Sequence, residues 1–341
     1  MNIKSAVSVV LLAAVFSSFA ACTGGSGSGS SKTGKSSGSE QNIEYPVEVK
    51  GETIKEKPTK VLSMSPSITE MIYDLGYESA LVGVSDYTAY PDSAKSKPAC
   101  GTVQLPKLDE ISKVQPQIII ASSNFVEDDL IKLQQMNAEV IIMPKAVSIE
   151  QLKTNYIDLA RIFEGKTTGG KKGEEVYFNL SKKLTEAQRR IKSYISQNSN
   201  AAQSAIVLKR LDYNIATGDT FEGSILKELM LENPAASYTG WVFPKEKKTE
   251  LNPNIIFYDS SIDEKTLQAN AVYKGLVAIK SKRIMQVDLS LFDQQGGRIF
   301  DAIYQMAVFA YPKAFEQADA GASSSASVSS SASAPSSSIS R

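Results

Sequence analysis

The side chains of this sequence favour binding over bond-making chemistry. Histidine, the commonest general base and metal ligand of proteins, is absent from all 341 residues. The sequence contains no Gly-x-Ser-x-Gly elbow, no Walker loop, no cysteine–histidine pair and no metal-ligand cluster. Asp86 and Glu70 could form a carboxylate pair, but nothing in the sequence fixes their spacing. We therefore expect a protein that is not an enzyme and that has no catalytic residue, cofactor or metal site.

Polar and aromatic side chains gather instead in the loops that follow predicted strands. Tyr87, Gln104, Phe221 and the run from Ser122 to Asn124 all lie in such loops. Open α/β sheets bind ligands in the crevice outside the carboxyl ends of their strands. These residues are therefore candidate ligand contacts.

Arg298 is a candidate for a different reason, because it opens the last predicted helix beside Gly296 and Gly297. A cation is unfavourable near a helix N-terminus, so we expect an anionic or polar partner for its guanidinium. A guanidinium can form forked hydrogen bonds with a propionate, amide or catecholate oxygen. The alternative is a solvated arginine of the first turn.

Two groups of short apolar runs alternate with helical patterns, which indicates two α/β lobes with parallel sheets covered on both faces. In the first lobe we predict strands at residues 61–64, 81–84, 118–121 and 140–143, and helices at residues 67–75 and 127–136. In the second lobe we predict strands at residues 205–208, 255–258 and 284–287, and helices at residues 224–232 and 298–310.

Helical periodicity predicts the connection between the lobes. From Ile149 to Phe163, and again from Val176 to Ile195, apolar residues recur every three or four positions and share one helical face. Residues 165–173 separate the two stretches. We interpret the second stretch as a long helix that runs along both lobes. An ordinary amphipathic surface helix of one domain is the alternative.

The two ends of the chain predict export and anchoring. Lys4 and the short apolar run that ends at Ala21 are typical of a signal peptide. The small residues before Cys22 resemble the bacterial lipobox, whose cysteine is acylated, although an ordinary secretory signal could also end beside a cysteine. The Gly/Ser-rich residues that follow would form a flexible tether. The Ser/Ala-rich C-terminal residues predict a disordered tail.

Charge and cysteine content exclude two further classes of protein. The sequence carries 37 basic and 37 acidic residues, so its formal net charge of zero gives no indication of nucleic-acid binding. Cys100 has no partner once Cys22 is acylated, so we expect no disulfide framework.

Seven short motifs follow one another between residues 60 and 299. They are residues 60–76, 81–91, 108–111, 115–121, 217–221, 251–256 and 297–299. Together they resemble, in type and order, the ABC-transporter substrate-binding proteins for vitamin B12, haem and iron–siderophores. The resemblance implies two Rossmann-like lobes joined by a single long α-helix.

The same resemblance implies roles for individual residues. Tyr87 matches a tyrosine that vitamin B12-binding relatives present to the corrin, although it could also be a packing residue at the lobe edge. Trp241 and Phe243 lie in the segment that matches an aromatic–proline pair near the ligand, and Phe292 would add an apolar wall. Arg298 resembles an arginine that faces the cleft.

The family docks on its permease through one acidic residue in each lobe. In the first lobe this position maps onto Asp109, with Glu110 adjacent. In the second lobe Glu228 is the candidate, although Lys227 could occupy the aligned position. The alternative is that all three carboxylates are ordinary surface residues.

The sequence thus predicts six segments. They are a lipoprotein signal peptide (1–21), a flexible tether (22–42), an N-terminal α/β lobe (43–145), a helical connector (146–200), a C-terminal α/β lobe (201–316) and a disordered tail (317–341). We expect a monomer outside the cytoplasm, anchored to the cell membrane through lipidated Cys22. It would capture a corrinoid and deliver it to an ABC permease dimer with ATPase subunits. An iron–siderophore or haem is the alternative ligand, and a lipid-tethered adhesion or scaffold protein is the alternative of a different class.

Overall fold

The computed structural model describes residues 44–198 and 201–316. Cys22, the signal segment, the tether and the C-terminal tail predicted above lie outside these residues. The described residues belong to one unit that begins at Asn42.

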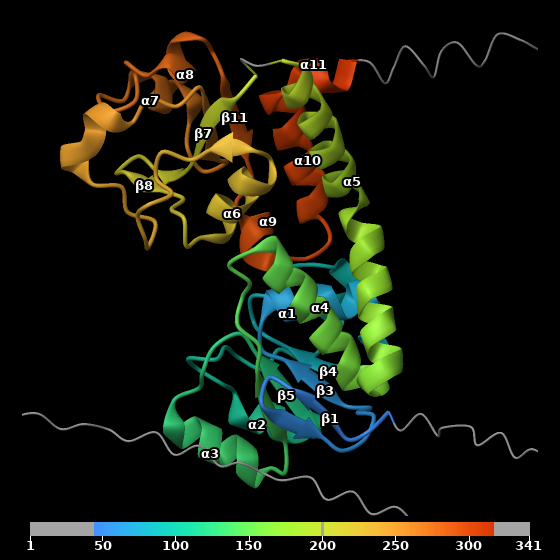
Figure 1. The fold of residues 1–341 in the computed structure, drawn as a ribbon. Helices are drawn as coiled ribbons and strands as arrows, with labels where there is room; N and C mark the ends of the chain where they lie inside the picture. The colour runs from blue at the N-terminus through green and yellow to red at the C-terminus, as the bar shows by residue number, and fades with distance from the viewer. Residues whose placement is uncertain (1–43, 199–200, 317–341) are drawn as a thin grey trace, which may run out of the picture. The chain divides into compact units, whose positions relative to one another are not determined.

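The first lobe is built on a four-stranded parallel sheet with the strand order β4-β3-β5-β6 (Figure 1). Its elements are β1 (Val47–Val49), β2 (Glu52–Ile54), β3 (Val61–Ser63), α1 (Pro66–Leu75), η1 (Glu78–Ala80), β4 (Leu81–Val84), η2 (Asp92–Ser96), α2 (Leu108–Val114), β5 (Ile118–Ala121), α3 (Glu127–Gln135) and β6 (Glu139–Ile142). Neighbouring side chains of β5 enter different cores: Ile118 and Ile120 pack toward α1 and α5, whereas Ile119 packs toward α2 and α3. Apolar layers on both faces explain why this strand is an unbroken apolar run.

The second lobe has a mixed sheet with the order β11-β10-β7-β8, and β9 pairs with β7 beside this path. Its elements are β7 (Gln203–Arg210), β8 (Asn214–Ile215), α6 (Phe221–Glu228), β9 (Leu231–Glu232), η4 (Lys245–Glu250), β10 (Ile255–Asp259), α7 (Glu264–Ala269), α8 (Val277–Lys280), β11 (Ile284–Val287), α9 (Ser290–Gln294), α10 (Ile299–Ala310) and α11 (Pro312–Phe315). The three predicted strands are parallel, but β8 runs antiparallel to β7, so the sheet is not wholly parallel as predicted.

The connection consists of two antiparallel helices, α4 (Ile149–Glu164) and α5 (Gly170–Gln197), joined by the π-helical turn η3 (Gly165–Gly169). A Cβ atom on Gly173 would lie 2.5 Å from Ile157 Cα, so glycine is needed where the two helices pack. With 28 residues, α5 spans about 42 Å.

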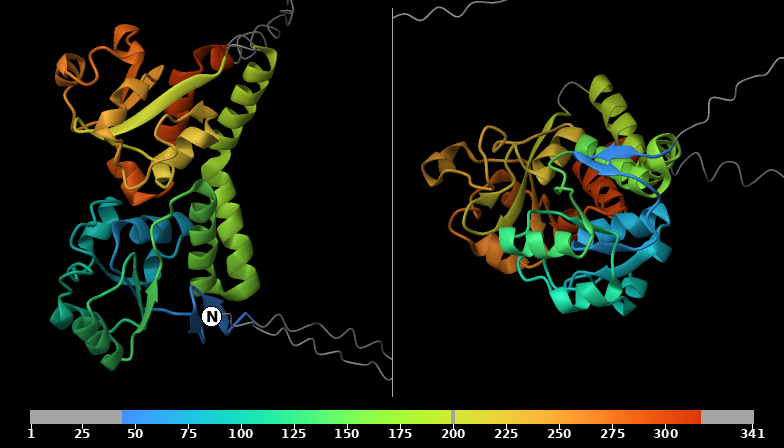
Figure 2. Two further views of the ribbon diagram at one scale, coloured as in Figure 1. Left: turned by 60° about the vertical axis from the view of Figure 1, so that its left-hand side comes forward. Right: turned by 90° about the horizontal axis from the view of Figure 1, so that it is seen from below.

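The long helix α5 packs against both lobes (Figure 2). One buried apolar cluster includes Ile68 of the first lobe, Leu184 of α5 and Phe257 of the second lobe. Two smaller clusters lie on the other faces of the two sheets. The predicted fold class, two α/β lobes joined by a long helix, is therefore confirmed.

Two predicted helix bounds are wrong: α5 begins at Gly170, inside the predicted break at residues 165–173, and the first helix of the second lobe is displaced. The prediction placed it at residues 224–232, whereas α6 spans Phe221–Glu228. The hydroxyl of Thr220 accepts a hydrogen bond from the backbone N–H of Gly223, which starts the helix earlier than its apolar periodicity indicated. Met230 adopts a left-handed conformation with φ of 55° shortly after the helix, so the helical pattern cannot continue to residue 232.

Candidate ligand-binding site

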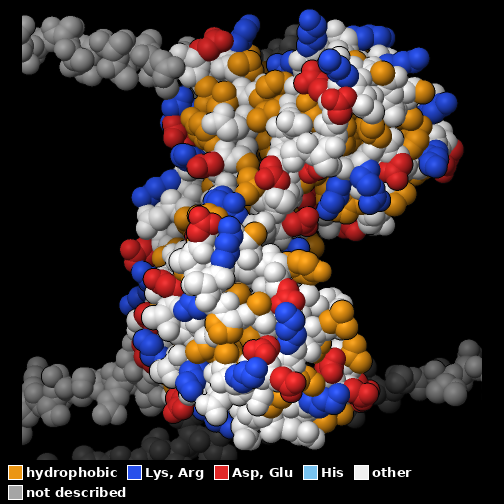
Figure 3. All heavy atoms as spheres, turned by 180° about the vertical axis from the view of Figure 1, so that it is seen from behind, with side chains coloured by type: hydrophobic (Ala, Val, Ile, Leu, Met, Phe, Trp, Pro, Cys, Tyr) orange, Lys and Arg blue, Asp and Glu red, His pale blue; other side chains and the backbone are white. Residues whose placement is uncertain are grey.

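The carboxyl ends of the parallel strands of both lobes lead into the loops that carry the predicted contacts. The loop after β4 contains Tyr87, the segment after β5 contains Ser122, and the segment after β11 leads through α9 to Arg298. In the space-filling view the surface is hollowed between the two lobes, and acidic and basic side chains are intermixed over the face shown (Figure 3).

Arg298 is held by a carboxylate of the other lobe. Its Nε donates to Glu70 Oε1 at 3.0 Å and its Nη2 to Glu70 Oε2 at 2.7 Å, and Nη2 also donates to Gln294. The Glu70 side chain is 2% exposed and that of Arg298 is 34% exposed. The guanidinium lies 3.7 Å from the ring centroid of Tyr90, on the loop that also carries Tyr87. The anionic partner expected for Arg298 is therefore a residue of the protein itself.

Further hydrogen bonds surround this ion pair. Asp74 Oδ2 accepts from the backbone N–H of Gly297 at 2.8 Å and from the Tyr156 hydroxyl at 2.6 Å, and burial raises the pKa of Asp74. The Gln295 side chain accepts from the backbone N–H of Ala146 at 2.8 Å and donates to its carbonyl at 2.7 Å. We call these contacts, together with the pair Glu70–Arg298, the inner junction.

The loop of residues 85–91 presents aromatic rings beside the inner junction. Tyr87 is 78% exposed and Tyr90 is 40% exposed. Asp86 accepts from the backbone N–H of Gly101 at 2.9 Å and pairs with Lys107 at 3.0 Å, and Lys107 lowers the pKa of Asp86. These contacts tie the loop to the rest of the first lobe while the ring of Tyr87 stays free.

Trp241 sits on a strained turn of the second lobe. Its φ is 64°, in the left-handed region that a bulky side chain rarely adopts. Asp219 accepts from the N–H of Gly240 at 3.0 Å, and the Thr217 hydroxyl accepts from the N–H of Trp241 at 3.2 Å. The Lys209 ammonium lies 5.1 Å from the centroid of the indole. Strain maintained by surrounding hydrogen bonds is common at ligand-contacting positions.

Two lysines from different lobes meet on one carboxylate. Lys145, which follows β6, lies 3.7 Å from Asp293 Oδ1, and Lys209, at the end of β7, lies 3.5 Å from Asp293 Oδ2. Behind them, Glu222 is 6% exposed. Burial raises the pKa of Glu222 to about 7; the charge of Asp293 adds to this shift, and both lysines oppose it. We call Lys145, Lys209, Asp293 and Glu222 the outer junction.

Sequence reasoning missed the outer junction and the role of Glu70. Lys145 lies shortly after β6 and Lys209 lies near the carboxyl end of β7, directly after the apolar run 205–208, and this position could have indicated them. Glu70 gave no such indication, because it lies inside α1 and not in a loop that follows a strand.

Three predicted aromatic contacts are packed in the core. Phe221, Phe243 and Phe292 are 5%, 1% and 2% exposed. Phe243 packs edge-on against Tyr238, and Phe221 and Phe292 belong to the large cluster shared by both lobes. Their rings offer no free face to a ligand, so they leave the set of proposed contacts.

The remaining predicted contacts lie at the surface of the first lobe. Gln104 and Asn124 are exposed, and Ser122 is half-buried. No hydrogen bond or ion pair within residues 44–198 and 201–316 joins them to Arg298 or Trp241. Their role as ligand contacts stays a prediction.

The three predicted docking carboxylates have different surroundings. Asp109 is exposed in the first turn of α2, and Glu110 next to it pairs with Lys113 at 2.8 Å. Glu228, on α6, accepts a hydrogen bond of 2.6 Å from the Gln188 amide of α5. Asp109 is thus the most accessible of the three.

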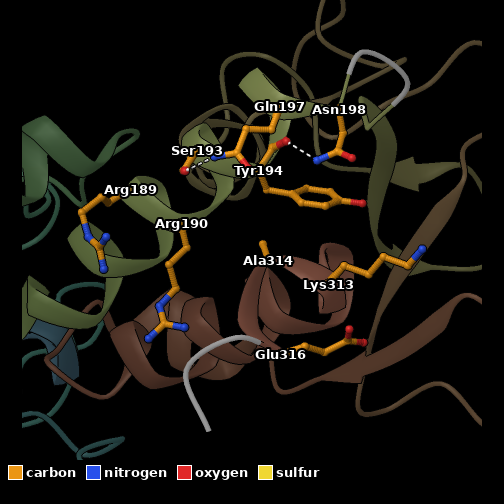
Figure 4. A pocket seen from close by; sticks show the side chains of 9 residues that line it. All are labelled: Arg189, Arg190, Ser193, Tyr194, Gln197, Asn198, Lys313, Ala314 and Glu316. Carbon is orange, nitrogen blue, oxygen red and sulfur yellow. Dashed lines mark hydrogen bonds between the residues drawn. The ribbon is translucent and has the colours of Figure 1, made fainter. Parts of the chain in front are cut away.

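A separate cavity of about 620 Å³ lies at the end of α5, beside α11 (Figure 4). Arg189, Arg190, Tyr194, Lys313 and polar residues line it. None of the predicted ligand contacts lines this cavity, and Arg190 is held by Glu186 at 2.6 Å. It is therefore not the site that the sequence predicted.

The described residues contain neither a cluster of metal-ligating side chains nor a membrane-spanning helix. Within them, no group of three or more acidic, cysteine or histidine residues is arranged to hold a metal ion. No helix in the same part of the chain has both the length and the apolar character needed to cross a membrane.

Comparisons with known proteins place this geometry in context. The family model described as periplasmic binding protein matches residues 61–290. An uncharacterised ABC transporter substrate-binding lipoprotein of Bacillus subtilis is 27% identical over 271 residues, which cover 78% of this chain and 84% of the relative. A vitamin B12-binding protein of Vibrio campbellii is 28% identical over 117 residues, covering 34% of this chain and 42% of that protein. The crystal structure of a possible iron-binding protein of Staphylococcus epidermidis has a TM-score of 0.64 at 21% identity, covering 75% of this chain and 100% of the other.

Proposed function

The chain belongs to the periplasmic binding protein family and is the substrate-binding protein of an ABC importer; on this premise we propose that its ligand is a corrinoid. The ligand would be of the vitamin B12 type, held between the two lobes and delivered to the permease. The similarity to a vitamin B12-binding protein over 117 residues supports this choice.

The main observation that supports a corrinoid ligand is the exposed aromatic loop of residues 85–91 beside the inner junction. Tyr87 is 78% exposed, and Tyr90 of the same loop lies against Arg298 of the second lobe. A corrin is a wide, flat and largely apolar ring, and an aromatic face can stack on such a surface. A loop that offers a free ring at the place where the lobes meet suits this ligand.

The outer junction favours a second candidate, haem or an iron–siderophore. Propionate and catecholate oxygens are anionic, and Lys145 and Lys209 share a single exposed carboxylate. The absence of histidine argues against histidine-ligated haem, whereas tyrosine ligation stays possible. The alternative of another class, a lipid-tethered adhesion or scaffold protein, is disfavoured because the family match makes the chain a substrate-binding protein.

The test is a titration of the mature chain with cyanocobalamin, haemin and ferric citrate. Trp241 is the only tryptophan, so its fluorescence reports on one place in the molecule. We expect cyanocobalamin to bind and to raise the melting temperature through mass action. Tyr87→Ala should weaken this binding, whereas Phe178→Ala, which removes an exposed ring on α5, should not. Binding of haemin or ferric citrate alone would replace the corrinoid, and no binding of any of the three would contradict the corrinoid proposal and mean that the ligand is another compound.

We propose further that Cys22 is lipidated and anchors the protein outside the cytoplasm. The curated relative of Bacillus subtilis is named a lipoprotein, and the lipobox-like residues before Cys22 support the same modification here. Cys22→Ser should release the protein from the membrane fraction. Mass spectrometry that found an unmodified N-terminus on the mature protein would contradict the proposal.

A further inference from the structure

The outer junction carries more positive than negative charge at its surface. Lys145 and Lys209 approach opposite oxygens of Asp293, so two cations share one accessible anion. The side chains of Lys145, Lys209 and Asp293 are 45%, 36% and 52% exposed, so both lysines are accessible to solvent. Glu222 is buried behind them, and its raised pKa of about 7 keeps part of the population protonated near neutral pH. The buried carboxylate therefore only partly offsets the second lysine.

The arginine at the inner junction is less suited to the same role, although its side chain is 34% exposed. Its Nε and Nη2 are both used by Glu70, and Nη2 also donates to Gln294. The ring of Tyr90 covers its guanidinium at 3.7 Å. A ligand anion would have to displace a carboxylate that is 2% exposed, whereas at the outer junction it would meet lysines that are already accessible.

The neighbouring indole indicates what kind of ligand reaches the lysines. The Lys209 ammonium lies 5.1 Å from the centroid of the Trp241 ring, and the strained turn at Trp241 holds the indole in this position. A cation beside an aromatic ring suits a ligand that combines an anionic group with a flat apolar body.

We infer that Lys145 and Lys209 form a subsite for one anionic oxygen group of the ligand, a carboxylate or a phosphate. Because Lys145 comes from the first lobe and Lys209 from the second, an anion bound to both bridges the lobes. Asp293 holds the two ammonium groups in place and competes with the anion. The inference rests on the proposed function only in that the ligand enters between the lobes.

The test uses small anions, so that it does not depend on the identity of the ligand. Inorganic phosphate and citrate are titrated separately at constant ionic strength, and Trp241 fluorescence is recorded. We expect saturable binding that Lys145→Gln/Lys209→Gln weakens by ~10-fold or more, because the charged hydrogen bonds to the anion are lost. The anion that binds more tightly, phosphate or citrate, identifies the preferred oxygen group.

Two further variants test the direction of the change in anion affinity. Asp293→Asn removes the competing charge and should strengthen anion binding by ~3-fold or more. The control Lys57→Gln/Lys280→Gln makes the same change in net charge on one exposed lysine of each lobe and should leave binding unchanged. Circular dichroism of each variant checks that it is folded. Lack of saturable binding of both anions, or an equal loss in the control, overturns the inference.

Failure of the inference and failure of the proposed function give different results. If cyanocobalamin binds and the lysine variants retain its affinity and the response to anions, the subsite is wrong and the corrinoid stands. If the anions bind through the lysines but cyanocobalamin does not bind, the subsite stands and the ligand is another anionic compound.

Discussion

The inner and outer junctions use the same kinds of side chain for opposite purposes. At the inner junction Arg298 is matched by Glu70, and Asp74 and Gln295 are satisfied by backbone groups and Tyr156. At the outer junction two lysines share one carboxylate, and all three side chains remain exposed by a third or more. The difference lies in the carboxylates: Glu70 is 2% exposed and is paired with one cation, whereas Asp293 is 52% exposed and is shared by two, so the outer junction has an excess of accessible positive charge that can receive a ligand.

A single short segment serves both junctions. Asp293 and Gln294 close α9, and Arg298 precedes α10. A Cβ atom on Gly296 would lie 2.0 Å from Glu70 Cδ, so glycine is required for the close approach of the lobes. The ligand-facing lysines are therefore positioned by the segment that holds the lobes together. With α5 packed on both lobes as well, we expect ligand binding to change their separation little.

The most disruptive test of this comparison removes the buried carboxylate of the inner junction. Glu70→Ala removes the two charged hydrogen bonds that join Glu70 to the partly exposed Arg298 of the other lobe, and we expect a loss of about 3 kcal/mol in the free energy of unfolding. Urea unfolding measures this loss. Glu110→Ala, which removes the exposed pair with Lys113, should cost far less. A loss at Glu70 no larger than that of the control would show that the inner junction does not stabilise the protein.

The second prediction concerns pH and the outer junction. Burial raises the pKa of Glu222 from 4.5 to about 7, so the folded protein holds this proton more tightly than the unfolded chain. The free energy of unfolding therefore falls as pH rises from about 4.5 to 7, and the full cost is present above that range. Glu222→Gln should be about 2–3 kcal/mol more stable than the wild type at pH 8, with little difference at pH 5.

Chemical denaturation at the two pH values tests this directly. Glu232→Gln changes an exposed carboxylate on β9 and serves as the control. A gain from Glu222→Gln that is equal at pH 5 and pH 8 would mean that ionisation of Glu222 does not destabilise the fold.

A smaller effect is expected from the aromatic side chains near the ligand. Trp241→Ala and Tyr87→Ala should each weaken cyanocobalamin binding by ~10-fold, the cost of one lost aromatic stacking contact. Isothermal titration calorimetry is suitable, since the first variant lacks the fluorescent residue. Neither change should alter unfolding by as much as Glu70→Ala. If both variants keep wild-type affinity, the ligand does not contact this side of the junction.

The smallest effect on ligand affinity is expected from the proposed docking surface. Asp109→Lys changes an exposed residue in the first turn of α2, and screening over ~8 Å should keep ligand affinity within ~3-fold. Uptake by whole cells should nevertheless be lost, because like charges opposed at an interface cost several kcal/mol. Asp128→Lys on α3 is the matched control. Glu228→Lys is less suitable, because it also breaks the hydrogen bond with Gln188.

Much of the fold could be predicted because its signals are local. The strand at Ile118–Ala121 is an apolar run between turn residues, and the helices on either side of Gly165 carry their buried residues at helical spacing. The predicted elements were wrong where a specific tertiary contact or hydrogen bond outweighed a weak sequence pattern. The hydroxyl of Thr220 started α6 early, and β8 joined its sheet as a two-residue antiparallel strand.

The candidate site was predictable only in part. The position of Tyr87 after a strand predicted a ligand contact, and its ring is exposed; Arg298 at the start of a helix predicted an anionic or polar partner, and it pairs with Glu70. An aromatic residue in a loop can face either the ligand or the core, and its type does not distinguish the two. Phe221, Phe243 and Phe292 were therefore assigned as contacts although they are buried.

By itself, the sequence determined the two-lobe α/β class and the long connecting helix, because backbone periodicity and strand burial depend on neighbouring residues. Only the tertiary structure decided which charges meet. Glu70 and Arg298 are 228 positions apart, and the two lysines of the outer junction reach Asp293 from different lobes. Charge pairing depends on a separation of a few ångströms, which the packing of α5 against both lobes sets and sequence spacing does not.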